Sequence, residues 1–254
     1  MPPADDDPHA PQDAPLEHAH DEGAIRERLA RQPKPGYLRD WIYGGIDGAV
    51  TTFAIISGAV GGALGERVIL ILGAAGLIAD GLSMAAANYT GAKAERDDRE
   101  RLRRIEERHI NRDPAGERRE VREVFRRKGF EGEALEQAVR VITADRERWI
   151  ETMLAEEYGA GDTLRSPWIA AIATFIAFIA CGLAPLAPFL FGLSAAWEIS
   201  IGLTAITFFA IGSAKSLWSP QSAWLSGLEV LLIGSAAAAA AYGVGAAADA
   251  LLSG

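Results

Sequence analysis

Long apolar stretches and one strongly charged stretch divide the chain. Five apolar segments each supply about the 20 residues that a helix needs to cross the hydrocarbon core of a bilayer. They cover residues 41–64, 68–91, 167–191, 195–213 and 223–251. The first segment carries two pairs of glycines four residues apart, Gly44 with Gly48 and Gly58 with Gly62, a spacing that lets membrane helices approach closely. The pattern predicts an all-α, polytopic membrane protein with five transmembrane helices and a helical cytoplasmic insert between helices two and three.

Charge is sharply segregated along the sequence. Residues 41–92 and 166–254 together contain eight charged side chains, whereas residues 93–165 contain eighteen of the 25 Lys and Arg and nineteen of the 34 Asp and Glu. A soluble domain does not separate charge in this way. We therefore expect transmembrane helices over 41–92 and 166–254 and a cytoplasmic helical domain over 93–165. The insert is nearly neutral, which argues against a nucleic-acid partner.

The first 40 residues are acidic, rich in proline and without an apolar stretch. This composition predicts a disordered tail rather than a signal peptide, which would need an apolar core. His18 and His20 lie among acidic residues and could bind a metal weakly, but a solvated acidic tail is the simpler explanation.

The basic residues predict the orientation in the membrane. Five lie before the first helix, eighteen lie in the insert, and Lys215 lies between the fourth and fifth helices. The positive-inside rule therefore places the N-terminus and the insert in the cytoplasm and the C-terminus outside. The Ala- and Arg-rich composition points to a bacterial plasma membrane.

Four helical stretches are expected in the insert. An apolar stripe through Leu102 and Ile110 continues the second transmembrane helix. Asp113 followed by Pro114 is a typical helix start, and Gly129 is a typical stop. A third helix is expected over 132–143, and a fourth is expected to start near Asp145.

Several carboxylates of the insert fall on these apolar stripes. Glu117 and Glu120 each lie four residues before an apolar position, and Glu106 with His109 adjoins the stripe of the preceding helix. Acids that face a small core need a partner or a bound cation. We therefore expect a divalent-metal cluster, and its O, N and S donors suit Fe²⁺ or Mn²⁺ better than Ca²⁺ or a structural Zn²⁺. Its candidate ligands are Glu106, His109, Glu117, Glu120, Met153 and Glu157. The alternative is ordinary ion pairing with the many basic residues nearby.

Acidic residues inside the membrane segments are rarer. Asp47, Asp80 and Glu229 lie within apolar stretches, and Met84 follows Asp80 by one helical turn. An ionised Asp near the bilayer centre costs about 2.5–3.5 kcal/mol even on the lenient insertion scale. These four residues are candidates for an ion or proton pathway, and an acid that hydrogen-bonds only for packing is the alternative.

Several motifs follow one another along the chain. The first helix carries Asp47-Gly48-Ala49-Val50-Thr51-Thr52-Phe53-Ala54, and the second carries Gly81-Leu82-Ser83-Met84. The insert carries Glu106, His109, Ile110, Pro114, Glu117 and Glu120, followed by Met153, Leu154, Glu157 and Gly159. In this order and spacing the motifs resemble the vacuolar iron transporter family, whose insert has the patterns Glu-x-x-Glu-Ile-x-x-x-Pro-x-x-Glu-x-x-Glu and Met-Met-x-x-Glu-x-Gly.

The resemblance implies a five-helix homodimer in a lipid bilayer that exchanges cytosolic Fe²⁺ for protons. Asp47 and Met84 would line the ion path between protomers, and the acids of the insert would collect metal. The chain departs from the family where His109 replaces Glu, Leu154 replaces Met, and Gly76 stands where an acid is expected. Asp80, one turn before Met84, is our candidate to replace that acid.

The sequence thus predicts a proton-coupled transporter that moves Fe²⁺ out of the cytoplasm, with Mn²⁺, Zn²⁺ and Co²⁺ as further candidate substrates. We expect neither an enzyme nor an organic cofactor. One rival is a metal-binding membrane scaffold or sensor without transport. Another is an intramembrane aspartyl protease with Asp47 and Asp80 as its dyad, although the motifs of such enzymes are missing.

Overall fold

The computed structural model describes residues 19–30, 35–161, 163–218 and 220–253, which fall into two units, Met1–Lys34 and Pro35–Gly254. In the first unit, α1 (Glu22–Ala30) has no buried residue. It begins where the Asp21 carboxylate accepts a hydrogen bond from the Ala24 amide at 2.9 Å. The structure therefore places a helix inside the segment for which the sequence predicts disorder. His20 is exposed, and His18 lies outside the described residues.

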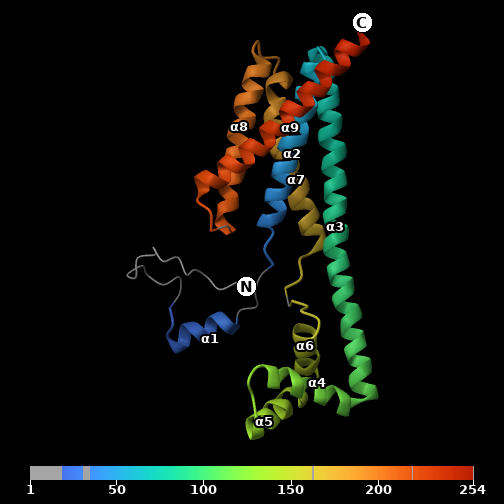
Figure 1. Cartoon of the computed structure of the whole chain (residues 1–254), viewed down its shortest axis with the longest axis vertical. Helices are drawn as coiled ribbons and strands as arrows, with labels where there is room; N and C mark the ends of the chain where they lie inside the picture. Colours follow the sequence, from blue (N-terminus) through green and yellow to red (C-terminus); the bar gives the residue numbers. More distant parts are fainter. Residues whose placement is uncertain (1–18, 31–34, 162, 219, 254) are drawn as a thin grey trace. The chain divides into compact units, whose positions relative to one another are not determined.

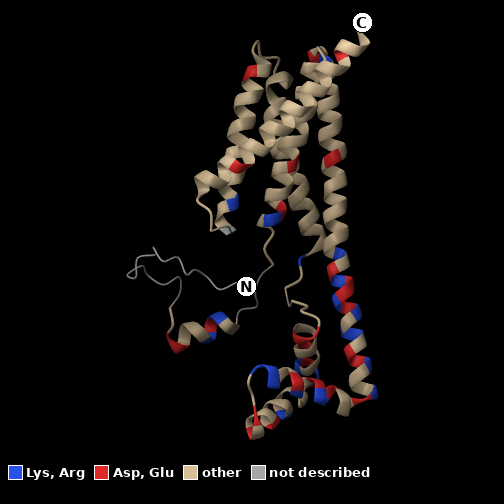
Figure 2. Ribbon diagram, viewed as in Figure 1, with Lys and Arg blue, Asp and Glu red and all other residues tan. Residues whose placement is uncertain are grey.

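The second unit contains five helices that are long and apolar enough to cross a membrane. They are α2 (Leu38–Gly61), α3 (Glu66–Arg112), α7 (Pro167–Leu190), α8 (Ala196–Lys215) and α9 (Ala223–Leu252). Their bounds lie within a few residues of the predicted ones, except that α3 continues far beyond the membrane segment. The described residues contain no strand, so the prediction of an all-α polytopic membrane protein is confirmed. Figure 2 shows that charge is sparse on these helices and dense on the lower half of α3 and on the insert.

The membrane helices pack through glycine. Helix α7 packs against α2 and α3, and α9 packs against α2 and α8. A Cβ atom at Gly48 would lie 2.2 Å from the Phe178 carbonyl oxygen, and one at Gly44 would lie 2.4 Å from the Thr174 carbonyl oxygen. A Cβ atom at Gly245 would lie 1.9 Å from the Gly58 carbonyl oxygen. The glycines near Asp47 thus admit α7 of the same chain.

Helix α7 continues through its two internal prolines and ends shortly after the second, at Leu190. The Ser200 hydroxyl of α8 donates to the Pro185 carbonyl at 2.7 Å. This bond attaches α8 to the proline-containing turn. Helix α8 is followed by a short 3₁₀ helix, η1 (Ser216–Trp218).

Helix α3 is one continuous element of 47 residues that begins in the membrane segment and ends in the insert (Figure 1). At a rise of about 1.5 Å per residue it is about 70 Å long. Its Asp113 cap accepts a hydrogen bond from the Gly116 amide at 2.8 Å and starts the next helix, as predicted. The same helix therefore carries Asp80 and Met84 in its membrane half and Glu106 and His109 near its C-terminal end.

The insert is completed by α4 (Pro114–Arg127), α5 (Gly132–Thr143) and α6 (Arg146–Glu156). Helix α6 is capped by Asp145, whose side chain accepts from the Arg148 amide at 2.8 Å. Gly129 follows α4 with φ of 90°, a left-handed conformation that suits glycine. A small apolar core lies between these helices and α3, and it includes Leu102, Val121, Ile150 and Leu154.

Candidate metal centre and ion pathway

Two acidic side chains lie in the interior of the insert. Glu106 on α3 is fully buried, and Glu117 in the first turn of α4 is 4% exposed. Each has one carboxylate oxygen, Oε2, that is buried and has no hydrogen-bond partner among the described residues. Burial, followed by repulsion from Glu106, raises the pKa of Glu117 to about 8. The site therefore holds a proton near neutral pH unless a cation replaces it.

Two further groups contact this acidic pair. The Tyr158 hydroxyl donates to Glu106 Oε1 at 2.9 Å, and His109 Nδ1 lies 3.4 Å from Glu117 Oε1. Burial raises the pKa of Glu157, and the nearby Glu106 carboxylate adds to the rise. Two carboxylates and one imidazole from α3 and α4 thus lie close together, with Glu157 at the end of α6 near enough to Glu106 to be affected by its charge.

Three other predicted ligands line a hollow beside this pair. Glu120, Met153 and Glu157 share a cavity of about 310 Å³ with four other residues of α4 and α6. Met153 is buried, as expected, but Glu120 and Glu157 are exposed. The expectation that Glu120 faces the core is wrong, because the side of α4 that packs on the core buries only Glu117 and Val121. Glu120 instead lies on its rim.

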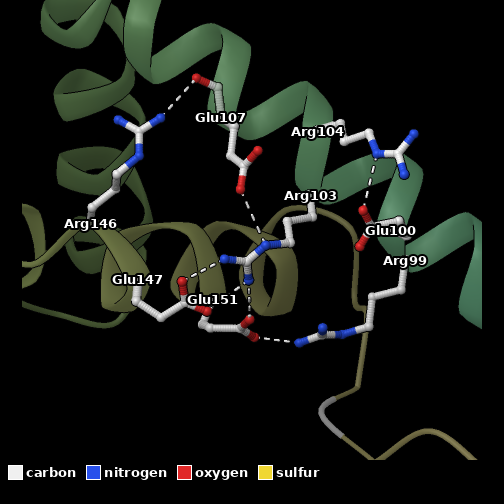
Figure 3. A network of polar contacts seen from close by, with 8 residues as sticks. All are labelled: Arg99, Glu100, Arg103, Arg104, Glu107, Arg146, Glu147 and Glu151. Carbon is white, nitrogen blue, oxygen red and sulfur yellow. Dashed lines mark hydrogen bonds and ion pairs between the residues drawn. The ribbon is translucent and has the colours of Figure 1, made fainter.

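Most other acids of the insert are paired with a basic side chain. Figure 3 shows Arg103 of α3 reaching Glu107 at 3.2 Å and Glu151 of α6 at 3.1 Å, while Arg99 also contacts Glu151. On α4, Arg122 holds Glu136 at 2.7 Å. In the described residues neither Glu106 nor Glu117 has such a Lys or Arg partner, although eighteen basic residues lie in the insert. Ordinary ion pairing therefore does not account for these two acids.

The arrangement can exchange protons for a cation. Two buried carboxylates that face each other accept either a shared proton or a positive ion, and carboxylate and imidazole together suit divalent transition metals. Across the described residues, no three His, Cys, Asp or Glu side chains are already arranged around one ion. Glu120 and Glu157 would have to turn inward from the rim to complete such a set.

The membrane candidates lie on α2 and α3. Asp47 is half-buried on α2, and Asp80 of α3 is exposed but close enough for the two carboxylates to repel each other. Met84 is half-buried one turn further along α3. A Cβ atom at Gly76 would lie 3.9 Å from Asp80 Oδ2. The Asp80 carboxylate therefore reaches the space beside position 76, where the resemblance leads us to expect an acid.

Glu229 differs from these residues because it has a basic partner. Its carboxylate lies 2.9 Å from Lys215 Nζ, and both residues line a cavity of about 630 Å³ with Arg39 and Tyr43 of α2. The ion pair gives Glu229 a structural explanation that Asp47 and Asp80 lack.

Sequence reasoning missed a set of polar residues that the fold brings together. Asp40, Asn88, Thr174 and Arg165 meet near the first turn of α2, and Tyr158 contacts Glu106. Asp40 precedes the apolar stretch by one residue, so it looks like part of the tail. Tyr158 directly follows the predicted ligand Glu157, and that position was the one available signal.

Comparison with known proteins identifies the family. The VIT family matches residues 38–246, which span all five membrane helices and the insert. This chain belongs to the VIT family. The match confirms the resemblance drawn from the motifs.

Individual relatives agree with this assignment. A vacuolar iron transporter of Toxoplasma gondii is 32% identical over 82% of this chain and 73% of its own length. Vacuolar iron transporter 1 of Eucalyptus grandis is 31% identical over 86% and 92%, and its namesake in Oryza sativa is 29% identical over 82% and 83%. These VIT proteins are named transporters, which confirms that the chain is not an enzyme. They are named vacuolar and come from eukaryotes, so the predicted bacterial plasma membrane has no support.

Proposed function

We propose that this VIT protein transports Fe²⁺ out of the cytoplasm in exchange for protons, with Mn²⁺ as a second substrate. The observation that carries the proposal is the buried pair Glu106 and Glu117, which in the described residues has His109 beside it but no Lys or Arg partner, in a domain full of Lys and Arg. The names of its relatives support iron as the substrate. A cation that replaces the proton of this pair removes the cost of burying unpaired carboxylates.

In this proposal the insert concentrates the ion before transport. Glu106, Glu117 and His109 supply the inner ligands, and Glu120, Met153 and Glu157 supply the rim. Metal must displace protons from these groups, so capture strengthens as the pH rises. The cytoplasmic side, where the positive-inside rule puts the insert, is the side of higher pH when protons flow inward.

The membrane step uses Asp47, Asp80 and Met84. We propose that two copies of the chain place these residues along a shared path, where the thioether favours Fe²⁺ over harder ions. Protonation of the carboxylates weakens the site and releases the ion on the far side. Glu229 stays at the edge of this path, paired with Lys215.

The decisive experiment is transport by purified protein in proteoliposomes with a pH gradient. Wild-type protein should take up Fe²⁺ only when protons can flow the other way, and Asp47→Asn should reduce uptake at least about a hundredfold. Glu66→Gln, which changes the exposed first residue of α3, is the matched control and should transport normally.

Two outcomes would contradict the proposal. If wild-type protein binds metal but shows no flux, the chain is a metal sensor or scaffold. If Asp47→Asn transports like wild type, the pathway is wrong even though the substrate is right.

The proposed orientation has its own test. A reporter at the C-terminus should be accessible from outside the cytoplasm, and a tag within the insert should be accessible from inside it. Finding both on the same side would contradict the positive-inside assignment.

A further inference from the structure

A buried carboxylate joins three membrane helices to the segment that returns from the insert. Asp40, in the first turn of α2, is 3% exposed. Its Oδ1 accepts hydrogen bonds from Asn88 Nδ2 of α3 at 2.9 Å and from Arg165 Nη1 at 2.6 Å. Its second oxygen, Oδ2, is buried and has no partner in the described residues.

Asp40, Asn88 and Arg165 form a polar node, and the other contacts of Asn88 and Arg165 connect this node to α7 and to the lower part of α3. Asn88 Nδ2 also lies 2.6 Å from Thr174 Oγ1 and 3.3 Å from the Ala170 carbonyl, so its two hydrogens have three acceptors. Arg165 also pairs with Glu95 of α3 at 3.3 Å. Its guanidinium therefore bridges α2 to α3 where α3 leaves the membrane segment.

The position of Arg165 in the sequence connects this ion-pair bridge to the candidate metal centre. Arg165 lies in the segment that connects Glu157 and Tyr158 at the candidate metal centre to the start of α7. The next residue, Ser166, donates its amide hydrogen to the Tyr37 hydroxyl at 2.8 Å, just before α2. The two residues before α7, Arg165 and Ser166, are thus attached to Asp40 in the first turn of α2 and to Tyr37 just before it.

The node is also close to the proposed ion path. Asn88 follows Met84 by one turn of α3, and Asp40 precedes Asp47 by seven residues, or about 10 Å along α2. Gly44 and Gly48 hold this part of α2 against the backbone of α7, so the first turn of α2 cannot slide without disturbing that contact.

We propose that Arg165 and Asp40 are positioning residues that transmit metal binding in the insert to the first turn of α2. The inference rests on the proposed function for its purpose, but the link between the two regions can be measured without transport. In this view Glu157 and Tyr158 move when metal binds, Arg165 moves with them, and Asp40 carries the change to the helix that holds Asp47.

Hydrogen exchange of the full-length protein in detergent tests the link directly. In wild-type protein, Mn²⁺ should slow amide exchange both in the insert and in the first turn of α2, by about threefold or more. In Arg165→Gln, Mn²⁺ should slow exchange in the insert alone. A purely structural role for Arg165 would change exchange with and without metal equally.

Transport supplies the second readout. Arg165→Gln and Asp40→Asn should each lower the maximal rate of Fe²⁺ uptake about tenfold, with KM within about twofold of wild type. The double variant should be no slower than the slower single variant, because the two residues act as one unit. Arg165→Lys, which keeps the charge, should recover part of the rate. Arg101→Gln, which breaks the exposed pair with Asp98 on the same helix, is the control and should have no effect.

The results for Arg165 and Asp40 can be distinguished from a failure of the proposed function. A wild-type protein without flux contradicts the proposed function, yet the loss of the Mn²⁺ effect on α2 in Arg165→Gln would still support the link. An unchanged Mn²⁺ effect in Arg165→Gln, or additive losses in the double variant, would overturn it. A variant that does not fold is replaced by Arg165→Lys, in which the Mn²⁺ effect on α2 should be weakened but present.

Discussion

The membrane helices and the cytoplasmic insert are held together by different interactions. In the membrane, helices meet backbone to backbone at glycine, as at Gly48 against Phe178. In the insert, the helices pack on an apolar core and are also joined by side chains of opposite charge, as at Arg103 against Glu147 and Glu151. Water screens the second kind of contact, while the first depends on shape alone.

The difference teaches how to recognise an acid with a function. In the insert, acids are common and normally paired, so an acid becomes informative when it is buried without a Lys or Arg partner, as Glu106 and Glu117 are in the described residues. In the membrane, acids are rare and costly, so their presence is already informative, and a base beside one, as Lys215 is beside Glu229, weakens the case. An acid in the insert is therefore judged by whether it lacks a Lys or Arg partner, whereas an acid in the membrane is a functional candidate unless it has one.

The largest effect is expected from filling a glycine contact in the membrane. Gly48→Ala would put a Cβ atom 2.2 Å from the Phe178 carbonyl and force α2 and α7 apart, at a cost of about 3 kcal/mol. Thermal unfolding in detergent should show a clear drop in melting temperature that salt does not alter. Gly91→Ala, where no atom lies within 4 Å, is the control. Equal melting temperatures for the two variants would contradict glycine-mediated packing.

The next largest effect concerns metal binding by the insert. Glu106→Gln or Glu117→Gln should weaken Mn²⁺ binding to the full-length protein by about 10- to 100-fold, because each removes a charged inner ligand. Calorimetry measures this, with Glu133→Gln on the exposed start of α5 as the matched variant. Binding that is unaffected by either inner substitution would leave the two buried acids without the role we assign them.

The pH dependence of stability should be intermediate in size. The pKa of Glu117 is raised from 4.5 to about 8, so the folded insert keeps a proton that the unfolded chain releases. Without metal, the contribution of Glu117 to stability is therefore greatest below about pH 4.5 and is lost as the pH rises through 8, a change of roughly 2 kcal/mol after allowing for solvent screening.

Glu117→Gln isolates that contribution. It should remove most of the pH dependence and make the metal-free protein more stable than wild type at pH 8, as measured by denaturation at several pH values. Added Mn²⁺ should stabilise wild type most at high pH. A wild-type stability that rises between pH 5 and 8 in the absence of metal would reverse the sign and refute the argument.

The smallest effect is expected at a partly exposed ion pair near the surface of the insert. Arg122→Gln breaks the pair with Glu136 that joins α4 to α5 and should cost about 0.5 kcal/mol, less at high salt. Comparing denaturation of this variant with that of Gly48→Ala at low and high salt would show whether the two regions depend on different forces. A large, salt-insensitive loss at Arg122 would remove the distinction.

Much of the fold could be predicted because its signals are local. The five membrane helices follow from apolar length, and α4 to α6 follow from Asp113, Gly129 and Asp145 as caps and stops. The α1 helix was not predicted, since its apolar content is too low to distinguish it from a solvated tail.

The site could be predicted only in part, because pairing is not local. The spacing of Glu117 placed it toward the core, but the same spacing misplaced Glu120, since spacing alone does not say which residues of α4 the neighbouring helices cover. Asp40 was missed because its partners Asn88 and Arg165 lie 48 and 125 residues away. The sequence pattern cannot tell a paired acid from an unpaired one when the partners come from distant segments.

Because α3 is unbroken, it also fixes the angle about its axis between side chains in the membrane and side chains in the insert. Glu106 follows Met84 by 22 positions on this helix, so at about 100° per residue the two side chains leave it about 40° apart. One residue added between them would turn the metal centre by about 100° while moving it by only about 1.5 Å. Seven added residues would move it by about 10 Å yet return it to within about 20° of its direction. Along this stretch of the chain, a small change in length is the more disruptive one.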